Sequence, residues 1–247
     1  MHVSRCAGAS TITAGDIYNI VRDSLRTVST GTLGKLRHSA FLVKESRTDN
    51  KGIGVGVFIG PNRAVTADHI LLDDQARVYA AMPEISKVLI LQVVKRVKQL
   101  VYAILSCEDE HDFLESYEGD PASLPGTQLA LCTFSVGVAE DLDDDELADK
   151  FAPGIGVMPA SGVKLSKHNH FLVYTSTTWP GDSGGALVMH DGKLVGLHLD
   201  GVNHLKELVE YESADLPTRV GQLEASVKDV IRSVANGCVA VLASSFK

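Results

Sequence analysis

The chain has 247 residues, of which 45% are hydrophobic and 22% are charged, a composition typical of a globular protein and not of a disordered one. Its formal net charge of −8 and pI near 5.6 argue against a nucleic-acid partner, because such a partner is bound by clustered Lys and Arg. This length is sufficient for one large domain or for two smaller ones.

Neither a membrane segment nor a secretory leader is apparent. The longest apolar runs are too short to span a bilayer, and the N-terminal residues contain no continuous apolar stretch. The chain has four cysteines and no CxxC pair, which favours free thiols in a reducing compartment: Cys6, Cys107, Cys132 and Cys238. We therefore expect an intracellular, cytoplasmic protein with no membrane partner, and the sequence gives no oligomeric state.

The predicted elements are mainly short strands separated by turns. Apolar residues at helical spacing in residues 14–27 predict an amphipathic helix within an N-terminal extension, residues 1–36. A strand is expected at 39–44. The segment 52–62, GIGVGVFIGPN, then alternates Gly with β-branched and aromatic residues before a turn, as one arm of a hairpin does. Further strands are expected at 77–81, 87–94, 100–107, 128–134, 170–175, 185–189 and 193–199.

Two segments interrupt this pattern of strands. The charged run 140–150 is interpreted as the start of a surface helix, and the apolar face of residues 222–234 predicts a C-terminal helix followed by a tail. Pro and Gly in 118–126 predict a boundary between a domain of residues 37–122 and a domain of residues 123–247. Many short strands with little helix between them predict an all-β barrel or sandwich.

The segment 181–186, GDSGGA, lies between two predicted strands and has the most specific pattern in the chain. Glycines on both sides of Ser183 allow a tight, exposed turn in which the hydroxyl projects and backbone N–H groups converge. The N–H groups of Gly181 and Ser183, with Asp182 between them, can form an oxyanion hole for a tetrahedral intermediate. A bare GxSxG would be read as a Gly-rich β-turn, but the six-residue pattern is far more specific.

A serine hydroxyl needs a base to become a nucleophile, and the segment 64–69, AVTADH, ends an apolar strand at His69. The stretches GVGVFIGPNRAVTADH (54–69) and GDSGGALV (181–188) resemble those of chymotrypsin-like (trypsin-like) serine peptidases, over roughly residues 37–235. The resemblance implies two six-stranded antiparallel β-barrels, with His69 on the first and Ser183 on the second. It implies a serine endopeptidase that acts on protein or peptide substrates and needs no cofactor.

The resemblance also implies a third catalytic residue, an aspartate between the base and the nucleophile that opens a short apolar strand and orients the imidazole. Asp112, in the segment DFLE (112–115), resembles this pattern. A Leu follows where a small residue is usual, and a Glu follows where an apolar one is. Asp109 and Glu110 therefore remain alternatives to Asp112.

In secreted members of the family, the residue equivalent to Asp182 pairs with an N-terminus freed by cleavage. This chain has no Arg/Lys-Ile-Val-Gly-Gly stretch that could supply such an N-terminus. The resemblance is therefore closer to HtrA-type and viral branches, which need no such activation. The partner of Asp182 is left open.

A specificity pocket is indicated by Thr178 and by the pattern Gly-x-His-x-x-Gly at 196–201, which is similar to picornaviral main proteases and glutamate-specific relatives. The similarity implies that Thr178, His198 and Gly201 bind a Glu or Gln side chain before the scissile bond. Thr177 stands where relatives that cleave after Arg or Lys have an aspartate, which disfavours basic substrates. The alternative for His198 is a satisfied histidine on a core strand.

Other functions remain open at this point. A catalytically inactive peptidase-like module could bind an extended peptide or a protein partner, and the same residues could hydrolyse esters. No metal site is expected, because His168 and His170 have no evident third ligand and the run 141–146 lacks the Gly and spacing of an EF-hand loop. The N-terminal 36 residues or the tail at 237–247 could block the cleft, although ordinary packing is the preferred interpretation.

Overall fold

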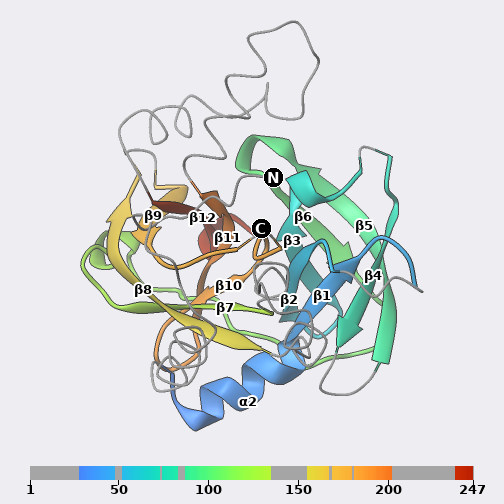
Figure 1. Ribbon diagram of the computed structural model, residues 1–247, viewed down its shortest axis with the longest axis horizontal. Helices are drawn as coiled ribbons and strands as arrows, with labels where there is room; N and C mark the ends of the chain where they lie inside the picture. Colours follow the sequence, from blue (N-terminus) through green and yellow to red (C-terminus); the bar gives the residue numbers. More distant parts are fainter. Residues whose placement is uncertain are drawn as a thin grey trace, which may run out of the picture.

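The computed structural model describes residues 28–47, 52–72, 74–82, 87–134, 155–166, 169–179, 181–201 and 237–246. The three helices predicted at 14–27, 140–150 and 222–234 lie outside these residues. The described part forms two closed antiparallel β-barrels of six strands each, side by side (Figure 1). This confirms the all-β, double-barrel fold.

Each barrel is built from six strands that follow one another in the sequence. The first contains β1 (Ala40–Lys44), β2 (Gly54–Gly60), β3 (Arg63–Ala67), β4 (Arg77–Met82), β5 (Lys87–Val97) and β6 (Tyr102–Ser106), in the closed order β1-β2-β3-β6-β5-β4. The second contains β7 (Leu129–Thr133), β8 (Gly156–Leu165), β9 (Phe171–Thr175), β10 (Ala186–Val188), β11 (Leu194–Gly201) and β12 (Cys238–Leu242), in the closed order β10-β11-β12-β9-β8-β7. The chain passes from one barrel to the other between β6 and β7, a stretch that includes the Pro- and Gly-containing segment 118–126.

The hairpin predicted around residues 52–62 is present. β2 pairs with β1 on one side and with β3 on the other. Its glycines have a packing role, because a Cβ on Gly56 would lie 2.2 Å from the ring of Phe41. The alternation of Gly with large residues therefore lets a ring from β1 lie against the β2 backbone.

Two strands were not predicted from the sequence. β8 contains Pro159 and Gly162, which indicate turns in a sequence read alone. β12 was taken for a tail, yet all five of its residues are buried and it pairs with both β9 and β11. A strand buried on both faces shows no alternation of polar and apolar residues, so the pattern gave no signal.

The helix α2 (Thr30–Ser39) was also not predicted, because its sequence TGTLGKLRHS has two glycines and a weak apolar stripe. Its start is capped by Ser29, whose hydroxyl accepts the Thr32 N–H at 3.0 Å. Leu36 is fully buried, and Thr32 donates its hydroxyl proton to the His190 carbonyl at 3.0 Å. Tertiary contacts therefore stabilise a helix of low propensity. Neither α2 nor any other helix in the described ranges is long and apolar enough to cross a bilayer.

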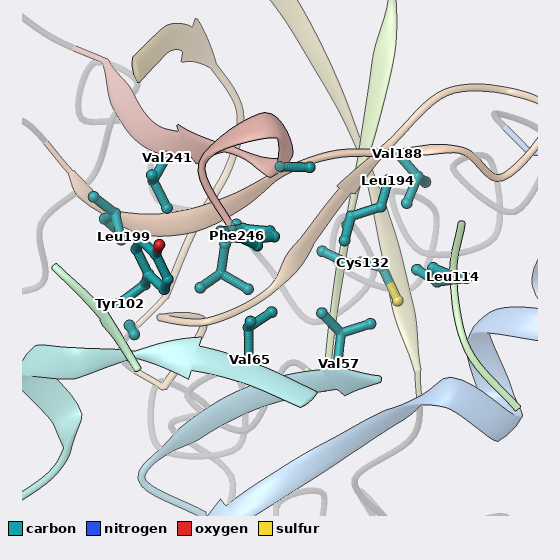
Figure 2. Packing of buried hydrophobic residues seen from close by; sticks show 14 of the residues in the cluster. Val57, Val65, Tyr102, Leu114, Cys132, Val188, Leu194, Leu199, Val241 and Phe246 are labelled. Atoms are coloured by element: carbon teal, nitrogen blue, oxygen red, sulfur yellow. The ribbon is translucent and has the colours of Figure 1, made fainter. Parts of the chain in front are cut away.

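Apolar side chains from both barrels meet in one cluster between them (Figure 2). Val65 and Tyr102 of the first barrel face Leu199 of the second, and Phe246 lies among them. Phe246 follows the short turn η5 (Ala243–Ser245); its ring centroid lies 5.1 Å from that of Tyr102. This shared core fixes one barrel against the other, and the candidate site lies where the two barrels meet.

Candidate active site

The predicted base and the predicted nucleophile come together from different barrels. His69 lies in the 3₁₀ turn η1 (Asp68–Ile70), which follows β3 directly. Ser183 lies in the loop between β9 and β10. The Nε2 atom of His69 is 3.0 Å from the Oγ atom of Ser183, a distance at which the imidazole can accept the hydroxyl proton.

Backbone contacts between the barrels set this distance. The Val55 N–H of β2 donates to the Ser183 carbonyl at 2.8 Å, and the Thr66 hydroxyl of β3 donates to the Val55 carbonyl at 2.6 Å. Gly184 fits against the same strand, since a Cβ there would lie 1.9 Å from the Val55 oxygen. The strands that lead to His69 therefore also hold the nucleophile loop.

The nucleophile loop turns through two glycines with positive φ, Gly181 at 93° and Gly184 at 90°, a conformation that is strained for other residues. The Gly185 N–H donates to the Asp182 carbonyl at 2.9 Å, and the Asp182 N–H donates to the Trp179 carbonyl at 3.1 Å. Within the described ranges, no protein acceptor is found for the N–H groups of Gly181 or Ser183. These are the two donors that the sequence suggested for an oxyanion hole.

Asp182 is fully buried behind the loop, and the structure supplies the partners that the sequence left open. Its Oδ2 atom accepts the Trp179 N–H at 2.7 Å, and Thr133 contributes a side-chain hydrogen bond. Burial raises the pKa of this carboxyl from 3.8 to about 7, against the opposing effect of these hydrogen bonds. Asp182 therefore holds the shape of the loop from inside the second barrel.

The three residues predicted for the specificity pocket lie on neighbouring elements of the second barrel. Gly201 of β11 pairs with Cys238 of β12, and the Cys238 thiol lies 3.8 Å from the Thr178 hydroxyl. His198 is 2% exposed, and its Nδ1 atom is 2.7 Å from the hydroxyl of Tyr174. Cys238 of β12 and Tyr174 of β9 were not identified from the sequence. The two residues lie side by side here only because their strands pair.

His198 is held in its neutral form. Burial, opposed by the negative charge of Asp200 and aided by the positive charge that His69 can carry, lowers the pKa of its imidazole from 6.5 to about 4. The ring meets Tyr174 in an edge-on arrangement, with centroids 6.1 Å apart. At neutral pH this position therefore presents a polar but uncharged ring.

A family model for the trypsin-like peptidase domain matches residues 54–197, more than half of the chain. The chain belongs to the trypsin-like peptidase family. No curated protein is similar enough in sequence to match it.

Several solved protease structures share the fold of this chain at low sequence identity. The Rv3671c protease of M. tuberculosis, in its inactive form, is 14% identical with a TM-score of 0.54, over 86% of this chain and 87% of that one. The HtrA-type protease AlgW with a decapeptide is 14% identical with a TM-score of 0.54, over 88% of this chain and 65% of that one. A serine protease of a human pathogenic astrovirus is 13% identical with a TM-score of 0.50, over 85% and 94%. At these identities the similarity concerns the fold alone.

The structure does not bring Asp112 to His69 in this trypsin-like peptidase. Asp112 is exposed and follows His111, whose N–H donates to the Pro61 carbonyl at 2.6 Å. Pro61 precedes β3 whereas His69 follows it, so Asp112 lies at the far end of that strand. The strand beside the histidine turn is β6. Val101 directly precedes β6, and its carbonyl accepts the Asp68 N–H at 2.8 Å. The position next to the turn is therefore occupied by Val101 and not by Asp112.

The two alternative carboxylates are also remote from His69. Asp109 forms an exposed ion pair with Lys87 at 3.0 Å, and this hydrogen bond lowers the pKa of the carboxyl. Asp109 lines a hollow of about 410 Å³ on the first barrel, which contains neither His69 nor Ser183. Glu110 is exposed on the same loop. Strand β6 ends at Ser106, before any of these acids, so none of the three candidate carboxylates lies beside the histidine turn.

Replacing Asp112 with Asn tests this placement. We expect the rate of peptide hydrolysis, kcat, to change by less than about twofold, whereas removing the charge of a triad aspartate reduces kcat roughly 10⁴-fold. The measurement is steady-state hydrolysis of the best peptide substrate by the two proteins. A loss of a thousandfold or more in a folded variant would contradict the geometry described above.

Proposed function

We propose that this trypsin-like peptidase is an active serine endopeptidase with Ser183 as nucleophile and His69 as general base. The observation that carries the proposal is the 3.0 Å separation between His69 Nε2 and Ser183 Oγ, reached by residues from two barrels. A hydroxyl at this distance from an imidazole can lose its proton as it attacks a carbonyl carbon.

The reaction would proceed through an acyl-enzyme. His69 takes the Ser183 proton as the Oγ atom attacks the scissile carbonyl, and then gives that proton to the leaving amine. Water, activated by the same imidazole, next releases the acyl group from Ser183. The imidazole of His69 accepts or donates the proton in each of these steps, so the reaction needs no cofactor.

The oxyanion of the tetrahedral intermediate would be held by the N–H groups of Gly181 and Ser183. Their support is the positive φ of Gly181, 93°, and the Asp182 carboxyl, which fixes the loop from within by accepting the Trp179 N–H. In related chemistry, one such donor contributes about 3–4 kcal/mol to stabilisation of the transition state.

We further propose that the substrate residue before the scissile bond is Gln or Glu, bound by His198 and Thr178 near Gly201. When the Tyr174 hydroxyl donates to His198 Nδ1, the 2.7 Å contact leaves a proton on Nε2 for donation to a side-chain oxygen. Because the pKa of His198 is lowered to about 4, the ring offers no positive charge to a carboxylate at neutral pH. Gln is therefore favoured over Glu, since an uncompensated buried carboxylate is costly.

Peptide-library profiling of the purified chain tests both parts of this proposal. At pH 7.5 we expect cleavage after Gln to dominate, with kcat/KM roughly tenfold or more above that for Glu. This ratio corresponds to a penalty of about 1.4 kcal/mol or more for an unpaired buried charge. Dominant cleavage after Arg, Phe or Leu would rule out the specificity while leaving the peptidase assignment in place.

Replacing Tyr174 with Phe supplies the matched control for the pocket. The ring stays and only the hydroxyl that orients His198 is lost, so selectivity for Gln should fall while cleavage of a good non-specific substrate persists. If the folded wild-type chain cleaves no peptide and binds one with its cleft, the inactive binding module replaces the peptidase as the better assignment.

A further inference from the structure

His69 lies on a turn with little stability of its own. The turn η1 spans Asp68–Ile70 and closes when the Leu71 N–H donates to the Asp68 carbonyl at 3.1 Å. No side chain caps its start. Short 3₁₀ turns have poor hydrogen-bond geometry, so the placement of His69 depends on contacts from outside the turn.

Arg96 of β5 provides such contacts on both sides of the histidine. Its Nε atom donates to the Asp68 carboxylate at 2.5 Å, and Nη2 donates to the Asp68 carbonyl at 3.2 Å. On the other side, Nη2 donates to the Leu71 carbonyl at 3.3 Å, and Nη1 donates to the Leu72 carbonyl at 2.7 Å. Only the planar, five-donor guanidinium can span so many acceptors at once.

The ion pair within this arrangement is shielded from water. The Asp68 side chain is 5% exposed and the Arg96 side chain is 14% exposed. Removing one partner of such a pair leaves a buried charge uncompensated, so it displaces or destabilises the segment far more than loss of an exposed pair does. The Asp68 N–H also donates to the carbonyl of Val101, the residue that precedes β6, and so the residue before His69 is held both by β5 and by the start of β6.

We propose that Arg96 and Asp68 are positioning residues, which hold His69 Nε2 within hydrogen-bonding distance of Ser183 Oγ. Neither touches the substrate; both act through the backbone of the turn. For its kinetic consequence the proposal rests on the peptidase activity proposed above. A displacement of about 1 Å in a reacting group can reduce a rate about 10²-fold, which is the scale expected here.

The experiment measures kcat and KM for Arg96→Ala and Arg96→Lys in the full chain. We expect kcat to fall about 10²-fold for Ala and about 10-fold for Lys, which keeps the charge but not the fork. KM should stay within about twofold, because the specificity pocket lies in the second barrel. Added guanidinium chloride at low millimolar concentration should restore part of the activity of Arg96→Ala.

Lys87→Ala is the matched control, because Lys87 lies on the same strand in an exposed ion pair with Asp109, with side-chain exposures of 47% and 66%. We expect kcat of this variant to equal that of the wild type. Thermal unfolding is recorded for each protein, and if Arg96→Ala does not fold, Arg96→Lys carries the test.

A readout independent of turnover separates this proposal from the peptidase assignment. The imidazole Cε1–H resonance of His69 should shift or broaden in the Arg96 variants and stay unchanged in Lys87→Ala. If the wild type hydrolyses nothing but this pattern is seen, the positioning role stands and the peptidase assignment fails. An unchanged resonance in both Arg96 variants overturns the positioning role, whether or not kcat falls.

Discussion

Replacing Ser183 with Ala should abolish peptide hydrolysis, with kcat reduced roughly 10⁴-fold or more. The Oγ atom, 3.0 Å from His69 Nε2, is the only atom lost, and it is the atom that would attack the scissile carbonyl. The residue is half-buried in a loop held by backbone bonds, so the unfolding temperature should change little. The measurement pairs peptide hydrolysis with labelling by a fluorophosphonate, which should modify Ser183 in the wild type and leave the variant unmodified.

Ser123→Ala is the control for this experiment, because Ser123 is an exposed serine on the linking segment, bonded to Tyr117 and Asp120. It should keep full activity and full labelling. Undiminished hydrolysis by Ser183→Ala would defeat the assignment of the nucleophile. A wild-type chain that is folded but is not labelled would instead indicate the inactive binding module.

Among substitutions of Ala for Gly in the active-site loop, Gly184→Ala should cause the largest loss of stability. The added Cβ would lie 1.9 Å from the Val55 oxygen and 2.9 Å from the Val55 carbonyl carbon, backbone atoms that cannot turn aside. The φ of 90° adds strain for any residue with a Cβ. Together these effects should cost about 3–5 kcal/mol, which lowers the unfolding temperature by roughly 10 °C for a chain of this size.

Gly126→Ala separates the strain from the clash. Gly126 has a similar φ of 80° with nothing within 4 Å of an added Cβ, so its replacement should cost only about 1–2 kcal/mol. Thermal unfolding of the two variants gives the comparison. Equal losses would mean that the close approach of the nucleophile loop to β2 does not limit stability.

The sequence was most informative where function depends on local geometry. The pattern GDSGGA requires a turn with positive φ, and the structure shows it at Gly181 and Gly184. The Gly-rich segment before His69 required a hairpin, and β2 and β3 form one. Such features are decided by steric limits on a few consecutive residues, so they could be read without knowledge of the rest of the chain.

Contacts between distant segments could not be read in this way. β12 was taken for a tail because its burial depends on β9 and β11, which precede it by tens of residues. Arg96 lies in a short basic stretch, residues 95–98, and nothing in that stretch indicates that its guanidinium is bonded to Asp68 and Leu72. Charge and hydropathy patterns record composition along the chain, whereas these contacts are set by strand pairing and burial.

The residue types at 69 and 183 and the order of the strands were determined by the sequence itself, because each depends on neighbours along the chain. Tertiary structure alone decided that His69 meets Ser183, that Asp182 is bonded to Trp179, and that Asp112 lies beyond the far end of β3. The physical reason is the closure of the barrels: strand register fixes which ends of β3 and β6 lie beside the turn of His69, and sequence spacing contains no measure of register.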